Sequence, residues 1–127
     1  MNFPEDVKYH SEHTWIKVDG ETGIIGITDF AQKELGEIVY VDLPNVGSSF
    51  ESDEVFGTVE AVKTVSDLFI PVAGTVIALN DALLKAPTLV NTDPFGKGWM
   101  LKIELKNPAE IDALLSCNDY KAGVGSR

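Results

Sequence analysis

One stretch decides the fold of this chain: Gly57-Thr-Val-Glu-Ala-Val-Lys63-Thr-Val-Ser-Asp67. Apolar residues extend from Val55 to Val62 and resume at Val65, so that a single lysine interrupts two apolar runs. Two such runs with a short break between them are typical of a β-hairpin. The sequence therefore predicts that Lys63 lies at the tip of a hairpin, with its amine exposed on a short tether.

Charge also distinguishes Lys63. It is the only basic residue from Glu34 to Leu84, a segment that contains nine acids: Glu34, Glu37, Asp42, Glu51, Asp53, Glu54, Glu60, Asp67 and Asp81. An amine at a turn can accept an acyl group through an amide bond, which would convert it into a long swinging arm. A Schiff-base lysine would need an apolar pocket or a cationic neighbour. The acidic surroundings therefore favour an acyl carrier over a lysine enzyme.

Length and composition predict one globular domain over residues 1–127. A chain of this size buries roughly two thirds of its unfolded surface, and 44% hydrophobic with 24% charged residues is typical of globular proteins. No apolar run approaches the roughly 20 residues of a membrane span, and the N-terminus resembles neither a signal nor a transit peptide. We expect a cytoplasmic bacterial protein, or a processed chain of the mitochondrial matrix.

The net charge of −10, from 10 basic and 20 acidic residues, narrows the choice of partners. The electrostatic field of this negative charge repels nucleic-acid phosphates and anionic lipid surfaces, so that neither nucleic acid nor membrane is expected as a partner. Partners with basic docking faces are favoured. The single cysteine, Cys117, cannot form an internal disulfide and is expected as a small buried residue of a helix.

Periodicity and turn residues predict the elements before the lysine: an irregular arm at 1–12, strands at 15–18 and 22–27, a helix from Thr28 or Asp29 to Leu35, a strand at 39–43 and a polar connection at 48–54. Asp19-Gly20 supplies the tight turn of the first hairpin. Gly36 is expected to end the helix in the left-handed conformation. Val39, Val41 and Leu43 alternate with polar residues and predict a strand with one buried face.

The elements predicted after the lysine are strands at 68–70 and 75–79, a helical turn at 81–85 capped by Asn80, a loop at 88–97 and a strand at 101–105. Ala73-Gly74 is expected to turn the chain into the strand at 75–79. Asn107-Pro108-Ala-Glu110 places a cap, a proline and a capping-box glutamate in order. It predicts a C-terminal helix that buries Ile111, Leu114 and Leu115 and a frayed tail at 122–127.

An internal repeat flanks the lysine. Gly36–Asp42 parallels Gly74–Asn80, and Phe56–Glu60 parallels Met100–Glu104. Two similar halves joined at a lysine-bearing turn predict a mainly β fold, a sandwich-like barrel of two small antiparallel sheets with pseudo-twofold symmetry, short helices and a C-terminal helix.

Other familiar sites are absent from the sequence. There is no Cys-x-x-Cys pair, Walker-type loop or Gly-x-Ser-x-Gly motif. His10 and His13 flank Glu12 at a spacing that could hold a metal, but no third ligand is near in sequence. We therefore expect ordinary surface histidines and no metal site.

Around the lysine, Glu60-Ala-Val-Lys63-Thr-Val-Ser-Asp67 resembles the H proteins of the glycine cleavage system, whose lysine carries lipoic acid. Biotin carriers have a similar hairpin, but usually place methionines where this chain has Val62 and Thr64. The resemblance extends over nearly the whole chain, through Lys8-Tyr9, His13, Trp15, Gly26-Ile-Thr-Asp29, Ala31-Gln32, Leu35-Gly36-Glu37-Ile-Val-Tyr-Val-Asp42, Leu43-Pro44, Val46-Gly47, Val59-Glu60, Val62-Lys63, Ser66-Asp67, Pro71, Gly74, Asn80, Pro87, Leu89-Val-Asn91, Pro94, Gly98-Trp99-Met100 and Ile103.

The resemblance implies a lipoyl-domain-like fold and a carrier with no active site of its own. Lys63 would bear lipoic acid as lipoyl-lysine, attached by a lipoate ligase or lipoyl transferase. The arm would carry the aminomethyl group of glycine from the glycine decarboxylase (P protein) to the aminomethyltransferase (T protein). Dihydrolipoamide dehydrogenase (L protein) would then reoxidise it.

The resemblance also assigns roles to other residues. Glu60 and Gly74 would be parts of the shape read by the lipoylating enzyme, although Glu60 could be an ordinary exposed strand residue and Gly74 could be needed only for its turn. Glu12 and Asp67 would line the groove that shelters the loaded arm, against the alternative of plain surface acids. Trp15 and Trp99 are expected to be packing residues.

One departure from the family pattern bears on function. The family commonly has glutamate after the histidine that matches His13, and this chain has Thr14. Either Glu12 substitutes for that acid, or the chain belongs to an H-like branch that relays lipoyl groups to other complexes without glycine cleavage.

Overall fold

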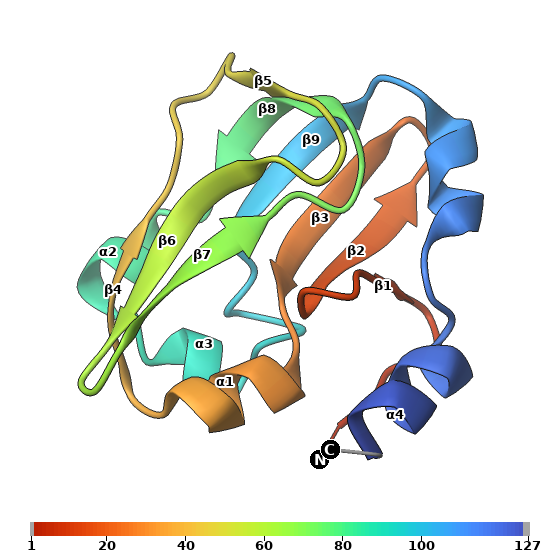
Figure 1. Cartoon of the computed structure of the whole chain (residues 1–127). Helices are drawn as coiled ribbons and strands as arrows, with labels where there is room; N and C mark the ends of the chain where they lie inside the picture. Colours follow the sequence, from red (N-terminus) through yellow and green to blue (C-terminus); the bar gives the residue numbers. More distant parts are fainter. Residues whose placement is uncertain (1, 126–127) are drawn as a thin grey trace.

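The computed structural model describes residues 2–125, which form two antiparallel sheets edged by short helices (Figure 1). The six-stranded sheet has the order β1-β2-β3-β9-β8-β5, and the three-stranded sheet has the order β4-β6-β7. The mainly β prediction is confirmed, with sheets that stay open rather than closing into a barrel. The elements are β1 (Lys8–Tyr9), β2 (Thr14–Asp19), β3 (Thr22–Ile27), α1 (Asp29–Leu35), β4 (Ile38–Asp42), β5 (Ser49–Phe50), β6 (Val55–Ala61), β7 (Val65–Phe69), β8 (Gly74–Leu79), α2 (Ala82–Lys85), α3 (Leu89–Thr92), β9 (Leu101–Leu105), the 3₁₀ helix η1 (Pro108–Ala113) and α4 (Cys117–Gly125).

The lysine-bearing hairpin is formed by β6 and β7, as predicted. The two strands pair antiparallel, with Val59 opposite Ser66 and Glu60 opposite Val65. The three residues between the strands, Val62 to Thr64, form the turn. In Figure 1 this tip projects at the end of the molecule that α1 occupies.

The internal repeat corresponds to equivalent strand pairs in the two sheets. β4 pairs with β6 and β8 pairs with β9, both antiparallel. Each pair has an irregularity, between Ile38 and Tyr40 in one and between Val76 and Ala78 in the other, and these positions are equivalent in the repeat. An irregularity of this kind, a β-bulge, changes the direction in which side chains point. As a result Val39 is 43% exposed. The prediction that Val39 is buried is therefore wrong.

The hairpin and helix before the lysine match the prediction in outline. β2 and β3 are joined through Gly20, which has a φ of 64°. Thr28 caps α1, because its Oγ1 accepts a hydrogen bond from the Ala31 N–H at 3.2 Å. Gly36 ends α1 with a φ of 81° but a ψ of −155°. This is an extended conformation with positive φ, so the predicted left-handed helical geometry is wrong.

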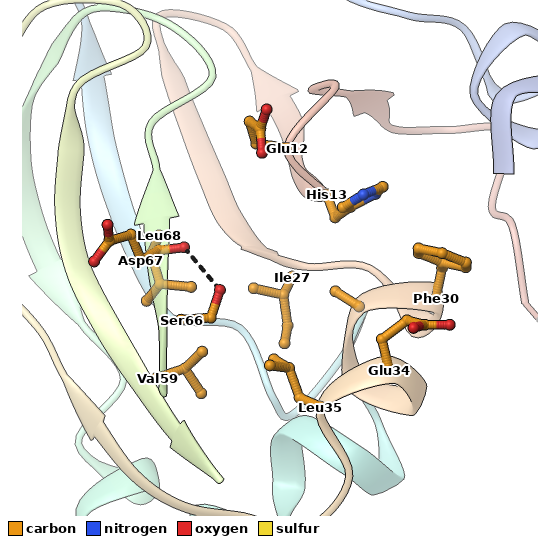
Figure 2. A pocket seen from close by; sticks show the side chains of 11 residues that line it. Glu12, His13, Ile27, Phe30, Glu34, Leu35, Val59, Ser66, Asp67 and Leu68 are labelled. Carbon is orange, nitrogen blue, oxygen red and sulfur yellow. Dashed lines mark hydrogen bonds between the residues drawn. The ribbon is translucent and has the colours of Figure 1, made fainter. Parts of the chain in front are cut away.

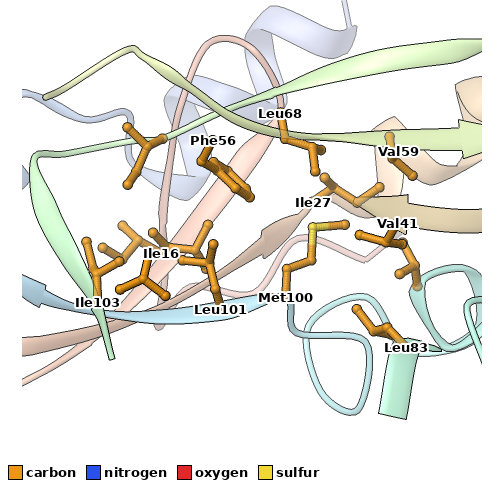
Figure 3. Packing of buried hydrophobic residues seen from close by; sticks show 14 of the residues in the cluster. Ile16, Ile27, Val41, Phe56, Val59, Leu68, Leu83, Met100, Leu101 and Ile103 are labelled. Carbon is orange, nitrogen blue, oxygen red and sulfur yellow. The ribbon is translucent and has the colours of Figure 1, made fainter. Parts of the chain in front are cut away.

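The main core lies between the sheets. Val59 and Leu68 of the lysine-bearing hairpin face Ile27 of β3 and Met100, which precedes β9 (Figure 3). All four are at most 2% exposed, and burying one such side chain contributes about 1.5–3 kcal/mol. The base of the hairpin is therefore fixed by the core, whereas its tip lies in solvent.

A second, aromatic cluster joins the two ends of the chain. Tyr9 and Tyr120 stack at 4.6 Å between ring centroids, and Trp15 and Trp99 belong to the same cluster, as predicted. The irregular arm predicted at 1–12 is partly wrong, because it contains β1 and the fully buried Tyr9. The tail predicted to fray from 122 is helical through Gly125, and residues 126–127 lie outside the described part.

Other differences come from contacts between distant residues. The predicted connection at 48–54 contains β5, and the predicted loop at 88–97 contains α3. The predicted C-terminal helix is two elements, η1 and α4. Glu110 accepts from the Ala73 N–H at 3.0 Å instead of closing a capping box, while Ile111, Leu114 and Leu115 are only partly buried. Asn80 does accept from the Ala82 N–H at the start of α2, at 3.3 Å.

Candidate functional site

The tip of the hairpin holds Lys63 exposed on a braced turn. The Ala61 N–H donates to the Thr64 carbonyl at 2.8 Å and closes the turn. The Val62 N–H donates to the Glu37 carbonyl at 3.0 Å, which ties the tip to the segment between α1 and β4. The lysine amine is therefore accessible to an enzyme while its backbone is held in place.

The Lys63 side chain lies over the end of α1. A Cβ placed on Gly36 would come within 3.4 Å of Lys63 Cε and 3.8 Å of Nζ. These are ordinary van der Waals distances, so the positive φ of Gly36 rather than the space around it favours glycine there. The preceding residue, Leu35, lines a cavity, so that a group attached to Lys63 starts beside that cavity.

The cavity has a volume of about 420 Å³ and lies between α1, the lysine-bearing hairpin and the loop before β2 (Figure 2). Its apolar lining includes Ile27, Leu35, Val59 and Leu68, with Phe30 and Ala31 from α1. Its polar lining comprises Glu12, His13, Glu34, Ser66 and Asp67. The Asp67 carboxylate points to the other side of β7, so that Glu12 and Glu34 are the acids of the lining (Figure 2). An apolar pocket with acids in its lining suits a ligand that has an apolar body and a cationic end.

The cavity brings together the two predicted shelter residues, Glu12 and Asp67, and adds two that sequence reasoning missed. Glu34 lies on the same face of α1 as Phe30, four residues earlier. That helical spacing could have indicated Glu34. His13 was expected to be an ordinary surface histidine, but it lines the cavity.

Three side-chain amide and carboxylate groups fix α1 in its place. Asn91 of α3 donates to Gln32 Oε1 at 3.0 Å and to the Gly36 carbonyl at 2.8 Å. Gln32 in turn donates to Asp29 Oδ1 at 2.6 Å. Burial alone would raise the pKa of Asp29, but hydrogen bonds from the Asn2 N–H and Gln32 to its carboxylate hold that pKa below its ordinary value. Hydrogen bonds therefore attach the helix wall of the cavity to α3.

The C-terminal helix is attached to residues around the cavity. The Tyr120 hydroxyl lies 2.8 Å from His13 Nδ1 and 2.7 Å from Oγ1 of Thr28, the cap of α1. The His13 ring packs on Phe30 with 4.8 Å between centroids. His13 has a φ of 71°, an uncommon conformation for a histidine. Tyr120 thus links α4 to two walls of the cavity.

Thr14 does not line the cavity. It is 1% exposed, and its Oγ1 donates to the Phe69 carbonyl at 2.8 Å. Glu12 is therefore the acid that the loop before β2 contributes to the cavity mouth.

The structure separates Glu60 from Gly74. Glu60 is exposed on β6, close to the tip and opposite Tyr40 of β4. Gly74 is buried in β8 of the other sheet, where a Cβ would lie 2.6 Å from the Glu104 carbonyl oxygen. The predicted turn at Gly74 is wrong, and the close approach of β9 gives a packing reason for glycine there.

The two histidines do not share a site. His10 is 7% exposed and lies 2.6 Å from Asp53 Oδ1, so the expectation of a surface histidine is wrong for His10. Within residues 2–125 no group of three His, Cys, Asp or Glu side chains could hold a metal. None of the helices in that part of the chain has the length and apolar character of a membrane span.

A lysine presented on a braced hairpin beside a largely apolar cavity is the arrangement of a carrier domain. Comparisons with known proteins specify which carrier. The family model for the glycine cleavage H-protein matches residues 7–126. The glycine cleavage system H protein of Bacteroides fragilis is 53% identical over 99% of this chain and all of its own, and that of Carboxydothermus hydrogenoformans is 57% identical over 93% and 91%. The crystal structure of the Mycobacterium marinum H protein matches with a TM-score of 0.88 at 34% identity, over 96% and 98% of the two chains.

The chain therefore belongs to the glycine cleavage H-protein family. This family is the lipoyl carrier of glycine cleavage, and its members are carrier subunits rather than enzymes. The identification made from the sequence is confirmed, and the lipoyl-relay alternative is not favoured.

Proposed function

We propose that this chain carries the aminomethyl group of glycine on a lipoyl group attached to Lys63. The observation that supports this most is the placement of Lys63. It is the only basic residue between Glu34 and Leu84, and it is exposed at a braced tip beside the cavity. A modifying enzyme and several partners can each reach an amine in this position.

The residues around Lys63 fit a lipoyl arm. When bound, lipoic acid supplies a disulfide that can accept the aminomethyl group and that becomes a dithiol once the group is passed on. Ser66 on the cavity wall is three residues from Lys63, which is at most about 10 Å along the chain. The cavity of about 420 Å³ falls in the size range of small-molecule pockets.

The chain's own residues would hold the cargo by charge and exclusion of water. The aminomethyl group is cationic, and Glu12 and Glu34 belong to the lining of the cavity that would receive it, whereas Asp67 contributes its backbone and directs its carboxylate to the other side of β7. The half-buried apolar side chains of Phe30 and Leu35 would cover the arm and limit the access of water. The loaded group is thereby protected between visits to partner enzymes.

Glu60 and Gly74 are our proposed recognition residues for the lipoylating enzyme. Glu60 is exposed on the strand that leads to Lys63, so an enzyme that binds the hairpin can contact it directly. Gly74 is buried and would contribute only by setting the spacing of β8 and β9.

The proposed partners are the P, T and L proteins of glycine cleavage and a lipoate ligase or lipoyl transferase. The net charge of −10 favours basic docking faces on all four. Docking should be weak, because fast dissociation lets one arm visit each enzyme in turn. The matching relatives are bacterial, which supports the cytoplasmic location over the mitochondrial one.

Glycine–carbon dioxide exchange tests the proposal. Lipoylated protein is supplied to a glycine decarboxylase, and exchange should rise well above that of the unlipoylated protein. Lys63→Arg is the matched control, because arginine keeps the charge but cannot take the acyl group, and it should support no exchange. Exchange by Lys63→Arg would contradict the role of Lys63. Absence of exchange with the lipoylated protein would contradict the carrier role and favour a lipoyl relay.

A further inference from the structure

His10 is a buried polar residue that neither the lipoyl arm nor the main core accounts for. Its ring has three directed contacts. Nδ1 accepts the Glu12 N–H at 3.0 Å, Nε2 lies 2.6 Å from Asp53 Oδ1, and the ring is nearly parallel to that of Phe69, at 6.5 Å and 6°. The side chain is 8% exposed, whereas that of Asp53 is 73% exposed.

These contacts define the tautomer of the neutral ring. Because a backbone N–H can only donate, Nδ1 of His10 must be the unprotonated acceptor. Nε2 therefore carries the proton and donates it to the Asp53 carboxylate. The His10 ring therefore links the Glu12 backbone to the Asp53 side chain, because it accepts a hydrogen bond from the first and donates one to the second.

These hydrogen bonds of His10 fix the loop of residues 10–14, which contributes residues to the cavity. The His10 N–H donates to the Thr14 carbonyl at 2.8 Å, and the His13 N–H donates to the His10 carbonyl at 3.0 Å, which closes residues 10–14 into a tight loop. Both Glu12 and His13 of this loop line the cavity. Their position depends on how the loop is fixed to the rest of the molecule.

Asp53 connects that loop to the lysine-bearing hairpin. It lies in the turn before β6, with a φ of 71°, and its N–H donates to the carbonyl of Ile70, which follows β7. The ends of both hairpin strands therefore meet at Asp53. His10 ties the cavity loop to the base of the same hairpin that presents Lys63 at its tip.

We propose that His10 and Asp53 form a clasp that positions Glu12 at the cavity mouth relative to the lysine-bearing hairpin. His10 is a positioning residue, because it acts through the Glu12 backbone and does not line the cavity. The consequence for cargo rests on the proposed function, but the positioning itself does not, and it can be measured on the full chain without a lipoyl group.

The first test is amide hydrogen exchange of Glu12 by NMR. His10→Phe keeps an aromatic ring against Phe69 and removes both hydrogen bonds, so exchange at Glu12 should be about tenfold faster. His10→Asn is the rescue variant, because an asparagine side chain accepts the N–H two residues on, and it should keep the protection. The amide of Ile103 in β9 should not change in either variant, which shows that the fold is intact.

A matched pair of variants tests the Asp53 side of the clasp. Asp53→Asn keeps an acceptor for Nε2–H, whereas Asp53→Gly removes it and tolerates the positive φ. Only Asp53→Gly should accelerate exchange at Glu12. The ¹⁵N shifts of the His10 ring should show an unprotonated Nδ1 and a protonated Nε2 in the wild type. The opposite tautomer, or unchanged Glu12 exchange in His10→Phe, would overturn the positioning role.

The second test is the lifetime of the aminomethyl group on the lipoylated protein. His10→Phe should shorten this lifetime at least twofold, and His10→Asn should restore most of it. An unchanged lifetime in His10→Phe would overturn the link between the clasp and the cavity. A wild-type chain that cannot be lipoylated would instead contradict the proposed function, and the exchange of Glu12 would still decide whether the clasp exists.

Discussion

Removing the Tyr120 hydroxyl should loosen the attachment of α4 to the cavity. Tyr120→Phe deletes the hydrogen bonds to His13 Nδ1 and Thr28 Oγ1 and keeps the ring that stacks on Tyr9. Each hydrogen bond contributes a net 0.5–1.5 kcal/mol or so. Because Tyr120 is 2% exposed, water does not replace these bonds, and we expect the free energy of unfolding to fall by about 1–3 kcal/mol.

Urea denaturation with matched variants measures this effect. Tyr40→Phe makes the same chemical change at a residue that is 51% exposed, where substitutions usually change stability by less than about 0.5 kcal/mol. The m-values should be equal in all three proteins, so that the midpoints report stability alone. If Tyr120→Phe and Tyr40→Phe had the same midpoint, the network that joins α4 to His13 and Thr28 would contribute nothing, and the reasoning would be refuted.

Three further predictions concern the support of the site. Thr14→Val removes the buried hydroxyl that donates to the Phe69 carbonyl and should cost about 1–3 kcal/mol in urea unfolding, whereas Thr88→Val, at an exposed helix cap without a side-chain hydrogen bond, should be neutral. Gly74→Ala drives a Cβ against the backbone of β9 and should cost about 1–3 kcal/mol, while an unchanged lipoylation rate of the folded variant would contradict the role of Gly74 in recognition. Asp29→Asn should have a lower free energy of unfolding than the wild type at pH 7. Because the pKa of Asp29 is lowered in the folded state, the ionised carboxylate stabilises the fold above the ordinary aspartate pKa of about 4, and this contribution is lost as the pH falls through the lowered value. A pH series should therefore show the free energies of unfolding of the two proteins becoming equal in acid.

Local sequence patterns sufficed for the hairpins and for most of the strands. The two apolar runs on either side of Lys63 predicted the hairpin of β6 and β7, because runs of this length separated by a short break are typical of paired strands. Asp19-Gly20 predicted the first turn, and of the two predicted caps of α1, Thr28 and Asp29, the structure has Thr28. The repeat around Lys63 corresponds in the structure to two equivalent strand pairs, β4 with β6 and β8 with β9.

Features set by distant residues were not predictable from local patterns. The bulge at Val39 exposes a valine that alternation assigns to the core. Glu110 satisfies the capping-box pattern but bonds to Ala73, because tertiary structure offers it a nearer donor. Two short elements, β5 and α3, contain few residues and carry no periodic signal.

The site was also only partly predictable, because it combines residues that are far apart in the sequence. The position of Lys63 was evident from charge and pattern together. Glu12 and Asp67 both belong to the cavity lining, but Asp67 directs its carboxylate away from the cavity, and the shelter role of both stays a prediction. Glu34 enters the cavity only because α1 packs across from the hairpin. The burial of His10 depends on Asp53, a residue 43 positions away in the chain.

The most direct test of the central claim is the mass of the chain after incubation with lipoate, ATP and a lipoate ligase, followed by peptide mapping. We predict one added lipoyl group on Lys63, and none on Lys63→Arg. An unmodified chain, with the ligase shown to be active on a control substrate, would contradict the claim that Lys63 carries the arm. Attachment at any other lysine would contradict it equally.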